Sequence, residues 1–319
     1  MARIFIKSVR ILFILLVIIY LILAIWYAWE HFRDPIQILK GEFTSLELID
    51  RQEYPVQLEA EIRIYQDLTL LSARKKDTLK ITVSLPHPLP SAKLPVVFLL
   101  GGLEIGRESL RYIPFHGQNI IVAYQYPYSP RYWYDEISWK QIPAIRRAVL
   151  MVPGQVISLI QWLRNQPDYF QRRVSVIGYS FGAMFIPAIY HLGQELEVPL
   201  GPGVIAYGGA NINLLLKTNL RFMKKIPRFL VANLASTAIH AVEPALHLPQ
   251  LRGNFLVING KQDHQIPRES WEQLHSLLPE PKTIVLLDEG HMHPRKTDLT
   301  LRIVQISRKW LLENGAIGP

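Results

Sequence analysis

A serine in the middle of the chain stands in a setting that suits a nucleophile. A short apolar run ends at residue 177, and residues 178–182 then read Gly-Tyr-Ser-Phe-Gly. A serine on a sharp strand-to-helix turn has its hydroxyl pushed out at the sheet edge, and the two glycines avoid collisions with the neighbouring strand and helix. The helix N-terminus behind Ser180 offers backbone N–H groups, and that of Phe181 would face an oxyanion. An ordinary tight turn can carry the same pattern, so the chain must also supply an acid and a base.

An acidic residue follows the buried strand expected at residues 254–258. Asp263 lies a few residues beyond that strand and shortly before Pro267, where a helix begins. Its carboxylate can point back across the edge of the sheet, or it can simply cap that helix. No acid directly follows the strand expected at residues 203–207, so Asp263 is the favoured partner.

Two histidines follow the last expected strand, residues 283–287. His291 comes directly after Gly290, which lets the loop turn sharply, whereas His293 precedes Pro294 and is held extended. The ends of neighbouring parallel strands lie at the same level, so His291 can reach Ser180.

The order of these residues predicts an acyl-transfer site. Ser180 would be the nucleophile, His291 the general base and then the general acid, and Asp263 the group that orients the imidazole. Each of the three comes just after a strand, which makes coincidence a poor explanation.

Strands and helices alternate along most of the chain. Alternating patterns at residues 56–65 and 79–85 predict half-exposed antiparallel strands joined by a charged turn at 74–77. Continuous apolar runs predict buried strands at 95–100, 119–124, 174–177, 203–207, 254–258 and 283–287. Helices are expected at 140–165, with breaks at its prolines, at 181–192 and at 298–312. This pattern predicts an α/β fold with a doubly wound, mostly parallel sheet, whose ligands sit beyond the C-terminal ends of the strands.

The composition narrows the classes of function. The 319 residues carry a formal net charge of +9, which indicates an anionic surface or substrate, yet no nucleic-acid-binding motif is present. Cysteine is absent, which excludes disulfides, thiolate metal sites and a cysteine nucleophile. We expect no cofactor, no metal and no nucleic-acid partner.

An uncharged apolar run at residues 11–29 predicts a transmembrane helix, because its length roughly matches the ~30 Å core of a bilayer. A cleaved signal peptide is the alternative, but bulky residues occupy the place of a cleavage site: Trp26, Tyr27 and Trp29. Basic residues precede the run, namely Arg3, Lys7 and Arg10. The positive-inside rule then predicts a single-pass membrane protein with residues 30 onward outside the cytoplasm.

At the residues described above, the chain resembles the α/β-hydrolase superfamily over nearly the whole region past residue 55. Residues 178–182 look like the nucleophile elbow, 98–103 like the third strand with its oxyanion loop, 257–263 like the acid turn and 290–291 like the histidine loop. The resemblance implies that the backbone N–H groups of Leu103 and Phe181 form an oxyanion hole. The strand-rich entry and residues 161–163 are similar to the dienelactone-hydrolase and prolyl-oligopeptidase-like branch. The common His-Gly of the oxyanion loop is Gly101-Gly102 here.

The residues and the resemblance together predict a division of the chain. We expect a basic tail at residues 1–10, a signal anchor at 11–29, a juxtamembrane linker or short helix at 30–52 and a hydrolase domain at 53–319. An insertion at about 210–250 lies where such folds carry a cap over the site. Residues 211–242 contain no acid and five basic residues among apolar ones: Lys217, Arg221, Lys224, Lys225 and Arg228. This pattern is typical of an amphipathic helix on an anionic membrane, of a cap that admits an acyl chain with an anionic head, or of a solvated helix with an ordinary core stripe.

The sequence therefore predicts a membrane-anchored serine hydrolase that cleaves a carboxylic ester or thioester, with a small-molecule or lipid-like ester as substrate. A serine peptidase or amidase of the same fold is one alternative. A catalytically silent hydrolase fold that serves as a membrane-tethered binding protein is another, and it predicts that His291 points away from Ser180.

Overall fold

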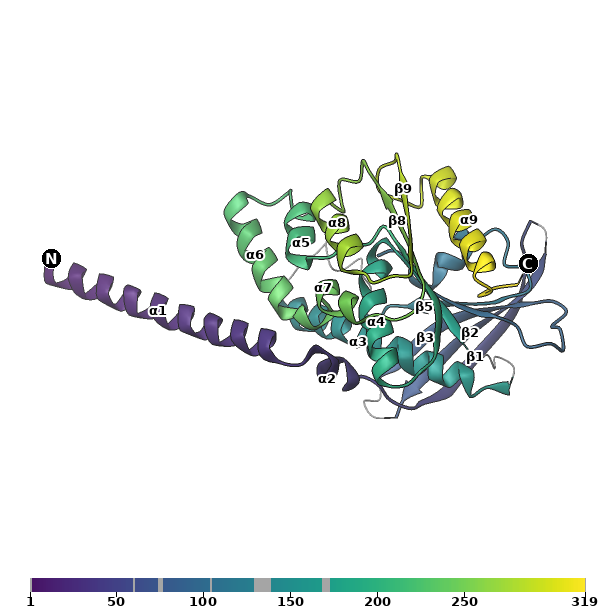
Figure 1. Ribbon diagram of the computed structural model, residues 1–319. Coiled ribbons are helices and arrows are strands. Elements are labelled where there is room, and N and C mark those ends of the chain that lie inside the picture. The colour runs from purple at the N-terminus through teal and green to yellow at the C-terminus, as the bar shows by residue number, and fades with distance from the viewer. Residues whose placement is uncertain are drawn as a thin grey trace.

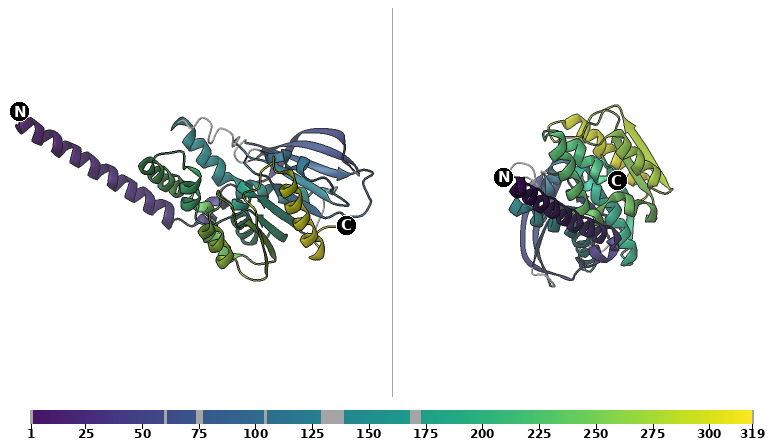
Figure 2. Two further views of the ribbon diagram at one scale, coloured as in Figure 1. Left: turned by 90° about the horizontal axis from the view of Figure 1, so that it is seen from above. Right: turned by 90° about the vertical axis from the view of Figure 1, so that its left-hand side faces the viewer.

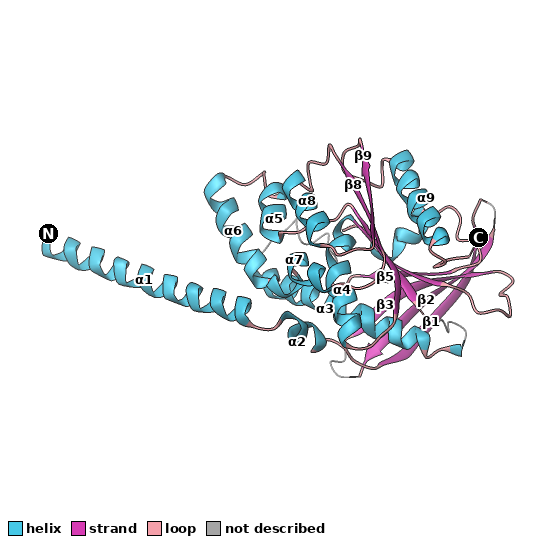
Figure 3. Ribbon diagram, viewed as in Figure 1, coloured by secondary structure: helices cyan, strands magenta, loops and turns pink. Residues whose placement is uncertain are grey.

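One mixed β-sheet organises the molecule (Figures 1 and 3). The computed structural model describes residues 2–59, 61–73, 77–103, 105–128, 139–167 and 173–318. Within these residues the sheet has nine strands in the order β1-β2-β3-β5-β4-β6-β7-β8-β9. The strands are β1 (Leu46–Gln57), β2 (Ile62–Ser72), β3 (Thr78–Pro86), β4 (Val96–Leu100), β5 (Ile120–Gln125), β6 (Val174–Tyr179), β7 (Leu200–Ala206), β8 (Phe255–Gly260) and β9 (Lys282–Leu287). The strands from β5 to β9 in sheet order pair in parallel, whereas β1, β2 and β3 pair antiparallel.

Helices cover both faces of this sheet (Figure 3). The α-helices are α1 (Ala2–Phe32), α2 (Pro35–Lys40), α3 (Ile142–Arg164), α4 (Ile186–Glu195), α5 (Ile212–Asn219), α6 (Lys225–Ala238), α7 (Pro244–His247), α8 (Arg268–Leu277) and α9 (Thr297–Glu313). Short 3-10 turns include η1 (Gly106–Tyr112), η5 (Ser180–Phe185), η6 (His240–Val242) and η7 (Leu248–Gln250). The predicted α/β fold with a mostly parallel sheet is confirmed.

The central strands are apolar throughout because both of their faces are buried. On β4, Phe98 and Leu100 belong to the core under α3 and α4, whereas Val97 and Leu99 belong to the core under α9. All five residues of β4 are buried. This two-sided packing holds the C-terminal ends of the strands in place as a platform for the loops that follow them.

The first strand of the sheet, β1, begins earlier than the sequence predicted. Residues 46–57 form β1, whereas the sequence predicted a linker as far as residue 52. The alternating run at 56–65 is divided between β1 and β2 by a turn in which Leu58 N–H donates to the carbonyl of Glu61. Most of β1 is exposed, so the strand lacks the apolar alternation by which a half-buried strand is recognised. The charged turn expected at 74–77 lies mostly outside the described residues.

Helix α3 runs without a break through Pro153, although a break was expected there. Pro143 lies in its first turn, where a proline is well tolerated. Residues 148–160 of the helix are buried without interruption, and this burial outweighs the roughly 3 kcal/mol that an internal proline costs. At Gly154 the preceding segment passes so close that a Cβ atom would lie 2.6 Å from the Cβ of Glu42.

Helix α1 projects from the domain as a single rod (Figures 1 and 2). Residues Phe5–Phe32 form a candidate membrane span, and its most apolar stretch of 18 residues has a mean hydropathy of 3.0 and is not covered by the rest of the protein. Helix α3 is also long and apolar, but 67% of its most apolar stretch is buried, as in the core helix of a domain.

Candidate active site

Ser180 lies on a strained turn directly after β6. It is the first residue of η5 and has φ = +51°, which is uncommon for a residue other than glycine. A Cβ on Gly178 would lie 2.6 Å from the carbonyl oxygen of Gly182, and one on Gly182 would overlap the carbonyl of Leu100. Both glycines are therefore required for the close approach of β4, β6 and η5. The turn is the nucleophile elbow in its geometry.

The structure brings the three predicted polar side chains together. The Oγ atom of Ser180 lies 2.7 Å from Nε2 of His291, and Nδ1 of the same ring lies 2.6 Å from Oδ2 of Asp263. Because a carboxylate only accepts, Nδ1 carries the proton, and Nε2 of the neutral ring accepts from the serine hydroxyl. We call these three residues the Ser180 cluster. His291 points toward Ser180, contrary to what a catalytically silent protein predicts.

Asp263 is fixed by the loop in which it lies. Its side chain is fully buried, and its second oxygen, Oδ1, accepts hydrogen bonds from the backbone N–H groups of Gln265 (2.7 Å) and Ile266 (3.0 Å). One carboxylate oxygen therefore closes the turn that leads to α8, while the other binds His291. A buried carboxylate needs such partners to remain charged.

The sheet register explains why these distant residues meet. Tyr179 at the end of β6 pairs with Ala206 of β7, which pairs with Ile258 of β8. The C-terminal end of β9 lies level with that of β8, because Gly260 at the end of β8 pairs with Leu287 at the end of β9. The loops that carry the Ser180 cluster therefore start along one edge of the sheet, which is the usual place for a ligand in such folds.

Tyr207 is a neighbour of the cluster that the sequence reasoning missed. Its ring meets that of His291 edge-on, with centroids 5.5 Å apart, and its backbone has φ = +59°. Among the described residues its buried hydroxyl finds no hydrogen-bond partner. Burial raises the pKa of the Tyr207 phenol, and the carboxylates of Asp263 and Glu289 raise it further. The only hint in the sequence is its position after β7, between the strands that carry the nucleophile and the acid.

The expected oxyanion loop follows β4, the strand beside β6. The carbonyl of Gly101 accepts a hydrogen bond of 2.6 Å from the hydroxyl of Tyr126, and the ring of Tyr126 packs edge-on against Phe181 at 5.1 Å. Tyr126 thus links the two backbone segments that hold Leu103 and Phe181. That their N–H groups bind an oxyanion remains a prediction.

The remaining candidates do not join the cluster. His293 accepts a hydrogen bond from Arg295 N–H through its own Nδ1, at 3.1 Å. Within the described part of the chain, no group of three or more His, Asp and Glu side chains could hold a metal ion.

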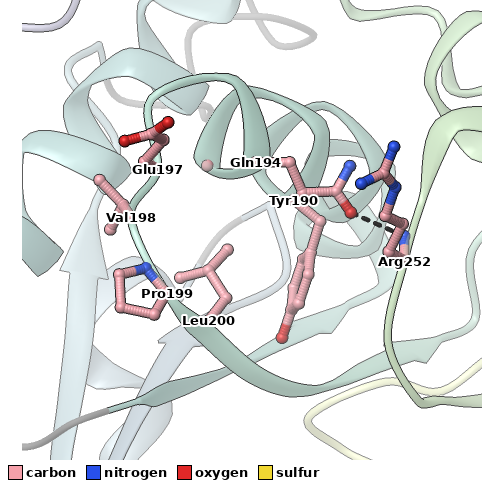
Figure 4. Close-up of a pocket in the computed structure, with 8 residues that line it drawn as sticks. Tyr190, Gln194, Glu197, Val198, Pro199, Leu200 and Arg252 are labelled. Carbon is pink, nitrogen blue, oxygen red and sulfur yellow. Dashed lines mark hydrogen bonds between the residues drawn. The ribbon is translucent and has the colours of Figure 1, made fainter.

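A surface pocket lies elsewhere on the molecule (Figure 4). It is lined by Tyr190 and Gln194 of α4, by residues 197–200 and by Arg252, whose backbone N–H donates to Oε1 of Gln194 at 2.6 Å. Leu200 is the first residue of β7, so this pocket opens at the end of the sheet opposite Ser180. It holds none of the candidate catalytic residues.

Comparison with known proteins assigns the fold. No protein-family model matches the chain, and no curated protein sequence matches it. An acetyl xylan esterase from Paenibacillus sp. has a TM-score of 0.63 at 14% identity, over 88% of this chain and 94% of its own. Acetyl xylan esterase 1 from Thermoanaerobacterium sp. has a TM-score of 0.61 at 16% identity, over 85% of this chain and 91% of its own.

A peptidase is similar as well. The acylaminoacyl peptidase from Pyrococcus horikoshii has a TM-score of 0.55 at 11% identity, over 84% of this chain but only 42% of its own. The sheet order, the elbow and these neighbours define the class of structure: the chain has the α/β-hydrolase fold, as the sequence predicted.

Proposed function

We propose that this protein is a membrane-anchored serine hydrolase that cleaves a carboxylic ester or thioester through an acyl-enzyme on Ser180. The observation that carries the proposal is the pair of hydrogen bonds in series, 2.7 Å from Ser180 to His291 and 2.6 Å from His291 to Asp263. Similarity to acetyl xylan esterases over most of both chains favours esters as the substrate class.

The first half of the reaction acylates the serine. As Oγ of Ser180 attacks the carbonyl carbon, its proton passes to Nε2 of His291, and the carboxylate of Asp263 stabilises the imidazolium through Nδ1–H. The negative charge moves to the carbonyl oxygen, near the backbone N–H groups of Phe181 and Leu103. One such donor contributes about 10²- to 10³-fold in kcat in well-studied enzymes.

The second half returns the enzyme to its starting state. When the bond to the leaving group breaks, Nε2–H of His291 donates its proton to the departing alkoxide or thiolate. A water molecule then attacks the acyl carbon, His291 accepts a proton from it, and the acid leaves as Ser180 regains its hydrogen. The products are one carboxylic acid and one alcohol or thiol, with no net change at the enzyme.

The anchoring belongs to the same proposal. Helix α1 would span the membrane once, and the chain from β1 onward, residues 46–319 and not 53–319 as first expected, would form the hydrolase domain on the non-cytoplasmic side, with the segment 210–250 as its cap. The exposed apolar surface of α1, which the domain leaves uncovered except at the C-terminal end of the helix, supports this assignment.

Removal of the nucleophile tests the enzymatic part. Ser180→Ala in the detergent-solubilised full chain should lower turnover of p-nitrophenyl acetate by about 10³- to 10⁶-fold. Ser276→Ala is the matched control, because its exposed hydroxyl donates to the carbonyl of Gln273 within α8. Equal turnover by the two variants would contradict the proposal and leave a binding protein with this fold.

A serine peptidase is the second candidate, favoured by the similarity to the acylaminoacyl peptidase. Turnover of p-nitrophenyl esters and of aminoacyl p-nitroanilides by the same preparation separates the two. We expect kcat/KM to be higher for the esters, and a higher value for the anilides would identify a peptidase.

A further inference from the structure

Helix α6 packs with its large apolar side chains on the outside. Four of them on the helix and one just before it are between 44% and 74% exposed: Phe222, Ile226, Phe229, Leu230 and Leu234. We call these five residues the α6 face. Their spacing of three or four residues places those on the helix along one side of it. An ordinary surface helix turns such a stripe toward the core.

Small and polar residues form the inner side of the same helix. Ala232 and Thr237 are buried, and the amide of Asn213 on α5 donates to Oδ1 of Asn233 (3.1 Å) and Oγ of Ser236 (3.0 Å). The orientation of α6 is therefore fixed by specific hydrogen bonds. These hydrogen bonds turn the apolar stripe toward the outside. The stripe is therefore not the core-facing side of an ordinary solvated helix.

Positive charge surrounds the α6 face. Arg221, Lys224 and Lys225 are exposed, and residues 211–242 contain no acid. The ammonium group of Lys217 lies 4.7 Å from the centre of the Phe229 ring, so that cationic and apolar groups are interleaved. A helix with this composition is suited to the interface of a bilayer, where lysine and arginine meet anionic headgroups and the apolar side chains enter the acyl region.

The end of α1 is fastened to the end of α6. The carboxylate of Glu30 accepts a hydrogen bond of 2.7 Å from Nη2 of Arg146, and Nε of the same arginine donates to the carbonyl of Ala238, the last residue of α6. The ring of His31 stacks on that of His240, with centroids 3.8 Å apart. Glu30 is only 6% exposed, so this junction is a packed joint between the apolar helix and the domain.

The views of the molecule place both helices on one side. In Figures 1 and 2, α6 lies at the side of the domain from which α1 emerges, and it rises away from the C-terminal end of α1 at an angle. A bilayer that surrounds α1 would therefore meet α6 before the rest of the domain.

We propose that the α6 face docks into the interfacial region of the same bilayer that α1 spans, with the basic residues of 217–228 at anionic lipid headgroups. The inference rests on the proposed anchoring of α1 and is independent of the chemistry at Ser180. A second copy of the chain is a poorer occupant, because it would bring two sets of basic residues together with no acid between them.

The absence of cysteine makes a direct test practical. Single cysteines at Ile226 and Leu230 of the full chain are labelled with a nitroxide, and the protein is reconstituted into vesicles of phosphatidylcholine with 30% phosphatidylglycerol. Ile284→Cys is the matched control, an exposed isoleucine on the edge strand β9. We expect collisions with oxygen to exceed collisions with a water-soluble nickel complex at residues 226 and 230, and the reverse at residue 284.

Two results with the labelled proteins alone would overturn the proposal. One is nickel accessibility at residues 226 and 230 equal to that at residue 284. The other is protection from both reagents that depends on protein concentration, which would indicate a second copy on the α6 face. Adding Lys224→Gln, Lys225→Gln and Arg228→Gln should raise nickel accessibility at residue 226 several-fold, and an unchanged value would contradict the role of the anionic headgroups.

The same samples separate this proposal from the others. Flotation of the protein with the vesicles tests α1 as an anchor. Hydrolysis of p-nitrophenyl acetate by the reconstituted protein, compared with Ser180→Ala, tests the enzyme. A protein that floats and has lipid-exposed labels, yet shows no hydrolysis that depends on Ser180, would sustain the docking and refute the hydrolase.

Discussion

The edge of the sheet at Ser180 and the outer side of α6 are built in opposite ways. At the edge, the three polar side chains of the Ser180 cluster are buried or nearly so, and each has a hydrogen-bond partner within the cluster. On α6, large apolar side chains are exposed, and small or polar residues face the protein. Burying a polar group costs free energy unless it is hydrogen-bonded, and exposing an apolar one forgoes about 25 cal/mol per Å².

The difference indicates what kind of molecule each region would bind. The side chains of the Ser180 cluster are hydrogen-bonded to one another within the chain, so under the proposed function the cluster lacks only a substrate. The α6 face is incomplete within the chain, because nothing in the described residues covers it. Substitutions in the Ser180 cluster should therefore lower catalysis, whereas substitutions on the α6 face should leave the free energy of unfolding almost unchanged.

After the loss of the nucleophile itself, the largest effect is expected at the acid of the cluster. Asp263→Asn should lower kcat for ester hydrolysis by about 10²- to 10⁴-fold, because an amide in place of the carboxylate favours the wrong histidine tautomer and no longer stabilises the imidazolium. Asp288→Asn is the matched control, a loop acid that accepts a hydrogen bond from Gln262. Steady-state kinetics on p-nitrophenyl acetate measures both, and similar losses in the two variants would remove the distinction between cluster and loop.

Truncation of isoleucine compares the two regions through stability. Ile258 on β8 is fully buried, and its change to alanine should cost about 2–5 kcal/mol because it leaves a cavity. Ile226 on α6 is 74% exposed, and its change to alanine should alter the free energy of unfolding by less than about 0.5 kcal/mol. Urea unfolding of the full chain in detergent measures both values. A large cost at Ile226 would show that the α6 face is covered by protein.

A smaller effect on stability is expected at low pH, through the buried side chain of His247. Burial lowers the pKa of His247 to about 4, and the neutral ring donates from Nε2 to the carbonyl of Ala241 at 2.8 Å. Below pH 6.5 the unfolded chain binds a proton that the folded chain does not, so stability is lost as the pH falls toward 4, by about 1.4 kcal/mol per unit. His247→Gln should flatten this slope between pH 6.5 and 4, as measured by urea unfolding. An unchanged slope would mean that the ring is not held neutral.

The smallest effect is expected at Tyr207. Tyr207→Phe keeps the ring against His291 and removes only a buried hydroxyl that has no partner among the described residues. Stability should stay the same or rise by about 1 kcal/mol, because an unsatisfied polar group no longer has to be buried. kcat/KM should stay within a few-fold, and a loss of 100-fold or more would show that the hydroxyl acts in the reaction.

The sequence predicted the parts of the fold that are buried on both sides. Strands β4, β5, β6 and β8 are continuous apolar runs because helices cover both of their faces. The order of Ser180, Asp263 and His291 after parallel strands led to the expectation that they meet, and the structure has them within hydrogen-bonding distance. Their catalytic roles are a prediction for experiment.

Other features depend on contacts that a sequence does not carry. Strand β1 lies at an edge with most residues exposed, so it has no apolar alternation to recognise. The break expected in α3 at Pro153 was wrong because tertiary packing holds the helix together there. Periodicity on α6 defines a stripe but not its direction, which is set by the hydrogen bonds of Asn213. The position of Tyr207 beside the Ser180 cluster follows from the place of β7 between β6 and β8, which the sequence alone does not give.

Covalent labelling of the intact protein tests the central claim most directly. A fluorophosphonate reacts with a serine only where a neighbouring base activates the hydroxyl, and Oγ of Ser180 lies 2.7 Å from Nε2 of His291. We predict one adduct per chain, located on the peptide that contains Ser180 and absent from Ser180→Ala. An unmodified chain, or an adduct that persists in the Ser180→Ala variant, would contradict the account.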